Sequence, residues 1–323
     1  MTIIAGIDEA GYGPTLGPLI VAASAFRLGE GARESDLNRL VRLKADHGGL
    51  RIGDSKQLYH PGGSIRRIET TTLGHAVLGR GHLPLRLGAL LAGAVDFDPD
   101  DVRALPWYGE RLPAMPLPRR SDVDDILSRA TRQQELLEDR GLTFLDFMVA
   151  PVEVPRFNRL TLAAGSKAWT LFYAAGRLIE EIVRRWPDEE LIIHVDRHGG
   201  RTHYGDLLQT FFPLAPLTTV RERREESVYR LAWPGRSPVR IDFRVKADLT
   251  RAPVGLASII AKTLRELFMG CFNEWFTGRV KDLSPTAGYP TDARRFLDAL
   301  AAAPSRRLDL GQLDEGGRLV RCR

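Results

Sequence analysis

The chain has 323 residues, of which 43% are hydrophobic and 27% are charged, and this is enough apolar material for a full core. Its formal net charge of +5 suits a polyanionic partner without identifying one. Cys271 and Cys322 are the only cysteines and cannot build a disulfide framework or a cysteine metal site, so we expect a reducing, cytoplasmic setting. No apolar run reaches the roughly 20 residues of a membrane helix, and the first residues lack the basic start of a signal peptide, so we expect no membrane association.

The N-terminal elements are predicted from short apolar runs separated by glycine and proline. Residues 2–7 and 18–26 are predicted strands, joined by the turn Gly11-Tyr12-Gly13-Pro14. Residues 33–45 have a helical pattern, and residues 53–56 form a predicted loop. Two neighbouring strands with a tight glycine turn indicate a hairpin at the start of the fold.

Residues 60–143 are rich in glycine and proline and are predicted to be an inserted subdomain of unknown role. Helices are predicted at about 86–94 and 122–139, the second with Ser121 as its N-cap. Arginines are scattered through the segment, namely Arg80, Arg86, Arg103, Arg111, Arg119 and Arg120. The segment could therefore extend a nucleic-acid-binding surface, form a solvated lid, or dock a partner.

The second half of the chain alternates strands and helices. Strands are predicted at 144–154, 191–195 and 240–245, and helices at 165–186 and 253–275. This alternation indicates an α/β fold, with residues 1–59 and 144–303 as its main domain. The tail, residues 304–323, is a possible hairpin that turns at Gly316-Gly317.

Four acidic residues follow predicted strands. Asp8 and Glu9 follow the first strand, Asp196 follows residues 191–195, and Asp248 follows residues 240–245. Sites in open α/β sheets form where strands end, so these carboxylates can converge. Clustered carboxylates repel each other and need a cation, and oxygen ligands select Mg²⁺ or Mn²⁺. Any one of these residues alone could equally be a solvated turn residue or a helix cap.

The glycine turn beside Asp8 and Glu9 is the second candidate feature. Gly11 and Gly13 allow the backbone to approach a ligand closely, so this loop could hold a phosphate or contact a sugar hydroxyl. Most short turns of this kind have no such role, and the turn alone is a weak signal.

At this point the sequence resembles a known family, the type 2 ribonucleases H (ribonuclease HII). The resemblance rests on four blocks in the family's order, which are residues 6–14 (GIDEAGYGP) with 16–18 (LGP), residues 54–58 (DSKQL), residues 246–248 (KAD) with 257–262 (ASIIAK), and residues 288–291 (GYPT). The family implies a ribonuclease H-like fold, with a mixed five-stranded sheet flanked by helices. It also implies hydrolysis of RNA in RNA–DNA hybrids and at ribonucleotides embedded in duplex DNA, giving 5′-phosphate and 3′-hydroxyl ends.

The resemblance also implies roles for individual residues. The metal ligands and catalytic residues would be Asp8, Glu9, Asp196 and Asp248, holding two Mg²⁺ or Mn²⁺ ions. The substrate contacts would be Gly11 and Gly13 at the ribose 2′-hydroxyl with Tyr12 between them, Tyr289 near the ribo–deoxyribo junction, and Lys56 and Lys262 near phosphates, with Ser55 and Ser258 as nearby hydroxyls. We expect a monomer whose partner is the nucleic-acid duplex.

Two positions depart from the family or have no counterpart in it. Tyr12 stands where the family usually has arginine, which removes a phosphate-binding cation beside the site. His198 follows Asp196, and we expect it to face solvent. Two alternative functions stay open at this point, a catalytically weak module that binds hybrid duplexes and a structure-specific DNA nuclease on the same fold.

Overall fold

The computed structural model describes residues 1–43, 48–60, 62–303 and 310–322. It contains one seven-stranded mixed sheet in the order β3-β2-β1-β4-β7-β6-β5. The strands are β1 (Thr2–Ala10), β2 (Leu19–Leu28), β3 (Leu142–Val152), β4 (Glu190–Asp196), β5 (Leu217–Glu222), β6 (Glu226–Leu231) and β7 (Val239–Arg244). The predicted α/β class is confirmed.

The predicted number of strands is wrong. β3, β2, β1, β4 and β7 form the expected five-stranded mixed sheet, in which β1 runs parallel to β4, and β4 parallel to β7. β6 and β5 add an antiparallel pair beyond β7. Most of β5 is exposed, and the two strands contain few apolar residues. The alternation of apolar and polar residues that predicts a strand is therefore weak here.

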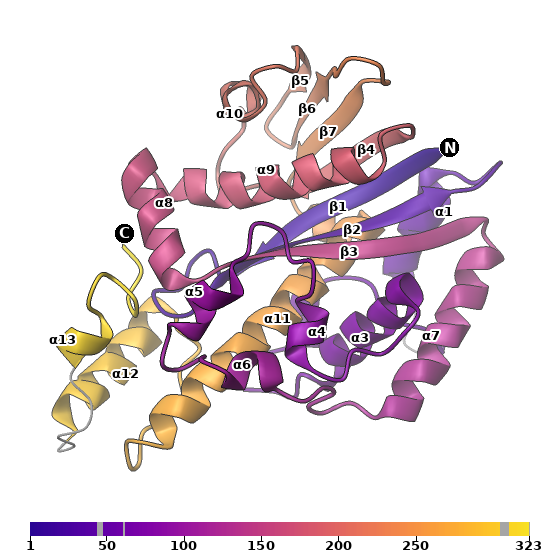
Figure 1. Cartoon of the computed structure of the whole chain (residues 1–323). Coiled ribbons are helices and arrows are strands. Elements are labelled where there is room, and N and C mark those ends of the chain that lie inside the picture. The colour runs from indigo at the N-terminus through magenta and orange to yellow at the C-terminus, as the bar shows by residue number, and fades with distance from the viewer. Residues whose placement is uncertain (44–47, 61, 304–309, 323) are drawn as a thin grey trace.

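Helices cover both faces of the sheet (Figure 1). One face packs against α8 (Val154–Ala164), α9 (Lys167–Arg185) and α10 (Gly205–Phe211). The other packs against the long helix α11 (Ala252–Thr277) and the helices of residues 60–143. No helix among the described residues is both long and apolar enough to cross a membrane.

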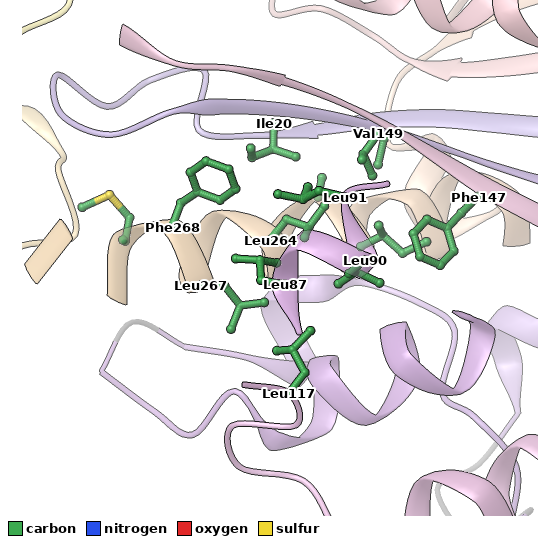
Figure 2. Packing of buried hydrophobic residues seen from close by; sticks show 14 of the residues in the cluster. Ile20, Leu87, Leu90, Leu91, Leu117, Phe147, Val149, Leu264, Leu267 and Phe268 are labelled. Atoms are coloured by element: carbon green, nitrogen blue, oxygen red, sulfur yellow. The ribbon is translucent and has the colours of Figure 1, made fainter. Parts of the chain in front are cut away.

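The inserted segment shares the core of the main domain. Its helices are α3 (Arg66–Arg80), α4 (Leu87–Leu90), α5 (Pro99–Arg103), α6 (Arg111–Ala114) and α7 (Val123–Glu138). Figure 2 shows Leu87 and Leu90 of α4 packed with Ile20 of β2 and Phe268 of α11 in one buried cluster. The segment is therefore continuous with the sheet's own core.

Several predicted boundaries differ from the structure. The α3 helix was not expected, because its sequence carries threonines and glycines in place of a clear apolar stripe. Asp122, not Ser121, caps α7, with its side chain accepting from the Asp125 amide. The helix expected at 33–45 is two short pieces, α1 (Glu34–Asn38) and η1 (Arg39–Arg42), and residues 44–45 lie outside the described residues.

The C-terminal tail is not a hairpin in the residues that the structure describes. After α12 (Pro290–Ala302), the tail continues with a single helical turn, α13 (Leu310–Leu313), and residues 304–309 and 323 lie outside the described part. Val320 then forms an isolated antiparallel bridge with Leu16. The tail thus pairs with the glycine-rich segment after β1 and not with itself.

Candidate active site at the carboxyl ends of three strands

All of the candidate residues line one pocket of about 850 Å³, which we call the carboxylate pocket. It contains the four predicted acids, which are Asp8, Glu9, Asp196 and Asp248, and the predicted substrate contacts, which are Gly11, Tyr12, Gly13, Ser55, Lys56, Ser258, Lys262 and Tyr289. These residues are up to 281 positions apart (Asp8 to Tyr289), so no local sequence pattern shows that all of them meet in one pocket.

Asp8 and Glu9 lie within β1 and not on the loop after it, because the strand continues to Ala10. Neighbouring strand residues point to opposite faces, and here Asp8 points toward α11. Gly6 allows this helix to approach, because a Cβ there would lie 2.2 Å from the Val254 backbone nitrogen. The helix then places Ser258 in hydrogen-bonding contact with Asp8.

Asp196 comes next to this pair because β4 runs parallel to β1, with Val195 opposite Ile7. Its Oδ1 accepts a hydrogen bond of 2.8 Å from the Ala247 amide. That bond fixes the start of the short helix η2 (Ala247–Leu249), which carries Asp248. The chain enters η2 through Lys246 in the left-handed conformation, at φ +53°. The third and fourth acids are thus held together by the backbone.

The acids affect one another's protonation. Burial raises the pKa of Asp8 well above its ordinary value, and the negative charges of Glu9 and Asp196 add to the rise. Burial, with the charge of Asp196 adding to it, raises the pKa of Glu9 to about 7. Burial and the charge of Asp248 raise the pKa of Asp196 to about 6. Mutual repulsion of this kind is what a bound cation relieves.

Asp54 is an acid of the carboxylate pocket that was not among the predicted site residues. It caps the short helix α2 (Ser55–Leu58), with its Oδ1 accepting from the Lys56 amide at 2.8 Å. Burial first and the charge of Asp54 second raise the pKa of Asp248. The sequence offered a signal, because Asp54 opens the DSKQL block, but its position suggested a loop residue.

Two serines and two lysines form the opposite wall of the carboxylate pocket. The hydroxyls of Ser55 and Ser258 are 3.0 Å apart, which ties α2 to α11. Lys56 is exposed, and its positive charge offsets part of the rise in the pKa values of Glu9, Asp196 and Asp248. Lys262 instead pairs with Glu266, whose Oε1 is 2.7 Å from the Lys262 Nζ.

The glycine turn lies against buried arginines. Gly11 has φ +93°, and a Cβ there would lie 2.5 Å from Nε of Arg265, so only glycine fits. Arg321, from the tail, is 4% exposed and donates to the carbonyl oxygens of Gly11, Pro14 and Gly17. Its guanidinium also lies 4.6 Å from the centroid of the Phe157 ring. The tail therefore holds the loop that carries the candidate substrate contacts.

Aromatic residues flank the same turn. Tyr289 is the N-cap of α12, is 45% exposed, and its Cε1 would lie 3.9 Å from a Cβ at Gly13. Tyr12 has the ammonium of Lys167 at 4.9 Å from its ring centroid. Lys167 thus brings a cation close to the position where the family's arginine is missing.

The expectation for His198 is wrong. The side chain is 7% exposed and lies among the rings of Phe172, Tyr204 and Phe243. Burial lowers its pKa to about 3, so the ring is neutral. His198 is therefore a core residue.

The donor set of the carboxylate pocket fits a divalent cation by its chemistry. Among the described residues, no group of three or more Asp, Glu, His or Cys side chains is arranged to hold a metal ion. The acids offer only oxygen donors, and Oε2 of Glu9 is buried without a hydrogen-bond partner. An unpaired buried carboxylate oxygen is costly without a cation, so the donor chemistry suits Mg²⁺ or Mn²⁺, although the described side chains are not gathered into a ligand cluster.

Comparisons with known proteins gave matches among solved structures alone. No protein-family model and no curated protein matches the chain. RNase HII of Archaeoglobus fulgidus, solved with PCNA, is similar at 18% identity and a TM-score of 0.41, over 97% of this chain and 99% of that one. Ribonuclease H2 of Pyrococcus horikoshii OT3 is similar at 16% identity and a TM-score of 0.39, over 91% of this chain and 83% of that one.

A third similar structure is Bst-RNase HIII in complex with Mn²⁺, at 15% identity and a TM-score of 0.39, over 97% of this chain and 68% of that one. In its four motif blocks and its mixed α/β sheet, the chain resembles a divergent type 2 ribonuclease H.

Proposed function

We propose that the protein is a divalent-metal-dependent endoribonuclease that hydrolyses RNA in RNA–DNA hybrids and at ribonucleotides embedded in duplex DNA. The observation that carries the proposal is the convergence of four acids, a glycine turn and Tyr289 in one open pocket. Unrelated solvated turn residues would not gather there from two strand ends and three helix starts.

Asp8, Glu9, Asp196 and Asp248 would hold the metal, with two ions as our expectation. Bound ions would supply charge stabilisation for the attacking and leaving oxygens of phosphodiester hydrolysis. The chain's own contribution is to keep the acids at fixed strand ends. The Ala247 amide holds Asp196, and Ser258 holds Asp8, so both carboxylates are oriented before a substrate enters.

Selection of RNA would depend on the glycine turn. The 2′-hydroxyl is the group that distinguishes ribose from deoxyribose, and only a close backbone approach can contact it at this turn. Gly13 leaves that space open, and Tyr289 presents an exposed ring beside it, while Gly11 lets the turn adopt its left-handed conformation against Arg265. Lys56 adds an exposed cation for a phosphate on the opposite wall.

The test compares three labelled duplexes with Mg²⁺ or Mn²⁺: an RNA–DNA hybrid, a DNA duplex with one ribonucleotide, and plain DNA. We expect cleavage of the first two, with 5′-phosphate and 3′-hydroxyl ends. Tight binding without cleavage of either would instead indicate a binding module. Cleavage of plain DNA would indicate a structure-specific DNA nuclease.

A further inference from the structure

A second pocket, of about 450 Å³, lies beside the carboxylate pocket. The helix α2 separates the two, because Ser55 and Lys56 line the carboxylate pocket while Gln57 and Leu58 line the second one. A four-residue helix rises only about 6 Å, so a chain-like ligand that occupies one pocket reaches the other. We call the second pocket the arginine pocket, after Arg51, Arg66, Arg67 and Arg129, which line it.

The arginine pocket carries an excess of positive charge. Asp125 is the one acid among its lining residues, so four arginines and one aspartate leave a net charge of 4 − 1 = +3. Asp125 is 2.8 Å from Nε of Arg129 and 4.0 Å from a terminal nitrogen of Arg66. Within the described residues, neither Arg51 nor Arg67 has a carboxylate partner within 4.0 Å.

Several other arginines of the insertion are paired with acids. Arg80 pairs with Asp146, Arg103 pairs with Asp100 and Glu110, and Arg119 pairs with Glu274. These are among the arginines that the sequence suggested for a duplex-binding surface, and their charges are already compensated. Arg51, and Arg67 at the start of α3, have no ion pair among the described residues, and both lie next to the carboxylate pocket.

The walls of the arginine pocket are held in place by buried groups. The Thr71 hydroxyl donates to the carbonyl oxygen of Arg51 at 3.1 Å, and the Thr70 hydroxyl donates to Ser121 at 2.9 Å. Ile68 of α3 and Ile126 of α7 are fully buried behind the pocket. The arginines therefore project from a well-packed backbone. Binding an anion costs less conformational entropy here than it would on a flexible loop.

We propose that the arginine pocket binds the phosphodiester backbone of the duplex that flanks the cleaved nucleotide. That the ligand is a duplex rests on the proposed function. That the pocket binds a phosphate backbone rests on its positive charge. The guanidinium fork matches two phosphate oxygens at once, and the side-chain amide of Gln57 is exposed beside it. A strand with its scissile phosphate at the four acids continues past α2 into this pocket.

The test uses charge reversal at Arg67, which is exposed and therefore not needed for folding. Arg67→Glu is compared with Arg230→Glu, which changes the net charge equally. Arg230 is exposed on β6 and lies opposite Arg240 at the start of β7, the end of the sheet far from Asp248. Affinity for a labelled plain DNA duplex is measured without metal over a range of salt concentrations.

We expect Arg67→Glu to weaken duplex binding about tenfold at low salt and to reduce the slope of log K against log salt by about 1, while Arg230→Glu changes affinity less than about twofold. Arg67→Lys should keep most of the binding. With a duplex that carries one ribonucleotide to fix its register, the loss should appear with long flanks and vanish when the flank that enters the pocket is cut short. Under cleavage conditions, KM should rise and kcat should stay unchanged.

Equal effects of Arg67→Glu and Arg230→Glu, or a loss that does not depend on flank length, would overturn the inference. The outcome is independent of catalysis. A protein that cleaves nothing but binds plain duplex through Arg67 would contradict the proposed function alone. A protein that cleaves normally and ignores Arg67 would contradict the inference alone.

Discussion

The sequence was enough to assign Asp8 to a site. It was not enough to predict the protonation of its carboxyl group. Adjacent acids before a glycine turn, and the blocks that follow in order, identified the residues of the carboxylate pocket. Burial and the charges of Glu9 and Asp196 raise the pKa of Asp8, and these depend on distances that only the folded sheet sets. His198 was misjudged for the same reason, because local sequence does not reveal which side chain the core encloses, and Asp54 was missed because the sequence does not show that its loop lines the carboxylate pocket.

His75 of α3 gives a pH-dependent prediction. The ring is fully buried, its Nδ1 donates to the Thr71 carbonyl oxygen at 2.8 Å, and burial lowers its pKa to about 4. The unfolded chain takes up a proton near pH 6.5 while the folded chain does not. Stability from this group is therefore complete above pH 6.5 and is lost as the pH falls toward 4.

Between about pH 7 and pH 4 the free energy of unfolding should fall by about 2–3 kcal/mol less in His75→Asn than in the unmodified protein. Each tenfold change in proton affinity is worth about 1.4 kcal/mol. Urea unfolding at a series of pH values measures this. Parallel stability curves for the two proteins would contradict the role of His75, even where the variant is less stable overall.

At the scale of elements, the main finding is that the C-terminal tail completes the glycine turn. The sequence could not show this, because Arg321 and Gly11 are 310 positions apart and a terminal arginine usually faces solvent. The buried guanidinium replaces water as the donor for three carbonyl oxygens of residues 11–17. Burial, with the charge of Arg265 adding to it, lowers its pKa to about 9, so it stays charged at neutral pH.

We expect Arg321→Met to lower stability by about 1–3 kcal/mol, because buried carbonyls lose their donor, and to lower the cleavage rate at least about tenfold. Arg321→Lys should restore part of the stability but little of the rate, since a single ammonium cannot reach all three carbonyls. Melting curves and single-turnover rates, taken where every variant is folded, separate the two effects. A normal rate in Arg321→Met would show that the tail does not shape the turn.

Helix α4 tests whether the insertion belongs to the core. Leu90 is fully buried in the same cluster as Ile20 and Phe268 (Figure 2). We expect Leu90→Ala to cost about 2–5 kcal/mol and the protein to unfold in one transition. Leu85→Ala is the matched control, because Leu85 is 63% exposed. A separate early transition, with the sheet still folded, would show that residues 60–143 form an independent unit.

At the scale of the whole molecule, the sequence predicted the strands that carry the site better than the rest of the sheet. β1, β2, β4 and β7 have strong apolar runs, because they lie in the buried middle of the sheet. β5 and β6 were missed because four of the six residues of β5 and three of the six residues of β6 are polar, and α3 was missed because its apolar stripe is weak. The path of the tail depends on long-range packing, which no local pattern records.

Metal binding should stabilise the whole fold. Asp8, Glu9 and Asp196 repel one another, and a divalent cation bound at the proposed site would relieve that repulsion. At about 100 times the dissociation constant, we expect Mn²⁺ to add about 2.7 kcal/mol of stability relative to EDTA. A melting temperature that is the same in Mn²⁺ and in EDTA would contradict the assigned ligands.

The central claim is that the four acids form a metal-dependent site that cleaves beside a ribonucleotide. Single-turnover cleavage of a DNA duplex with one ribonucleotide, by the unmodified protein and by Asp8→Asn, tests it most directly. We predict cleavage with Mg²⁺ or Mn²⁺, none in EDTA, and a rate at least about a hundredfold lower for Asp8→Asn with an unchanged circular dichroism spectrum. Undiminished cleavage by Asp8→Asn, or cleavage in EDTA, would contradict the claim.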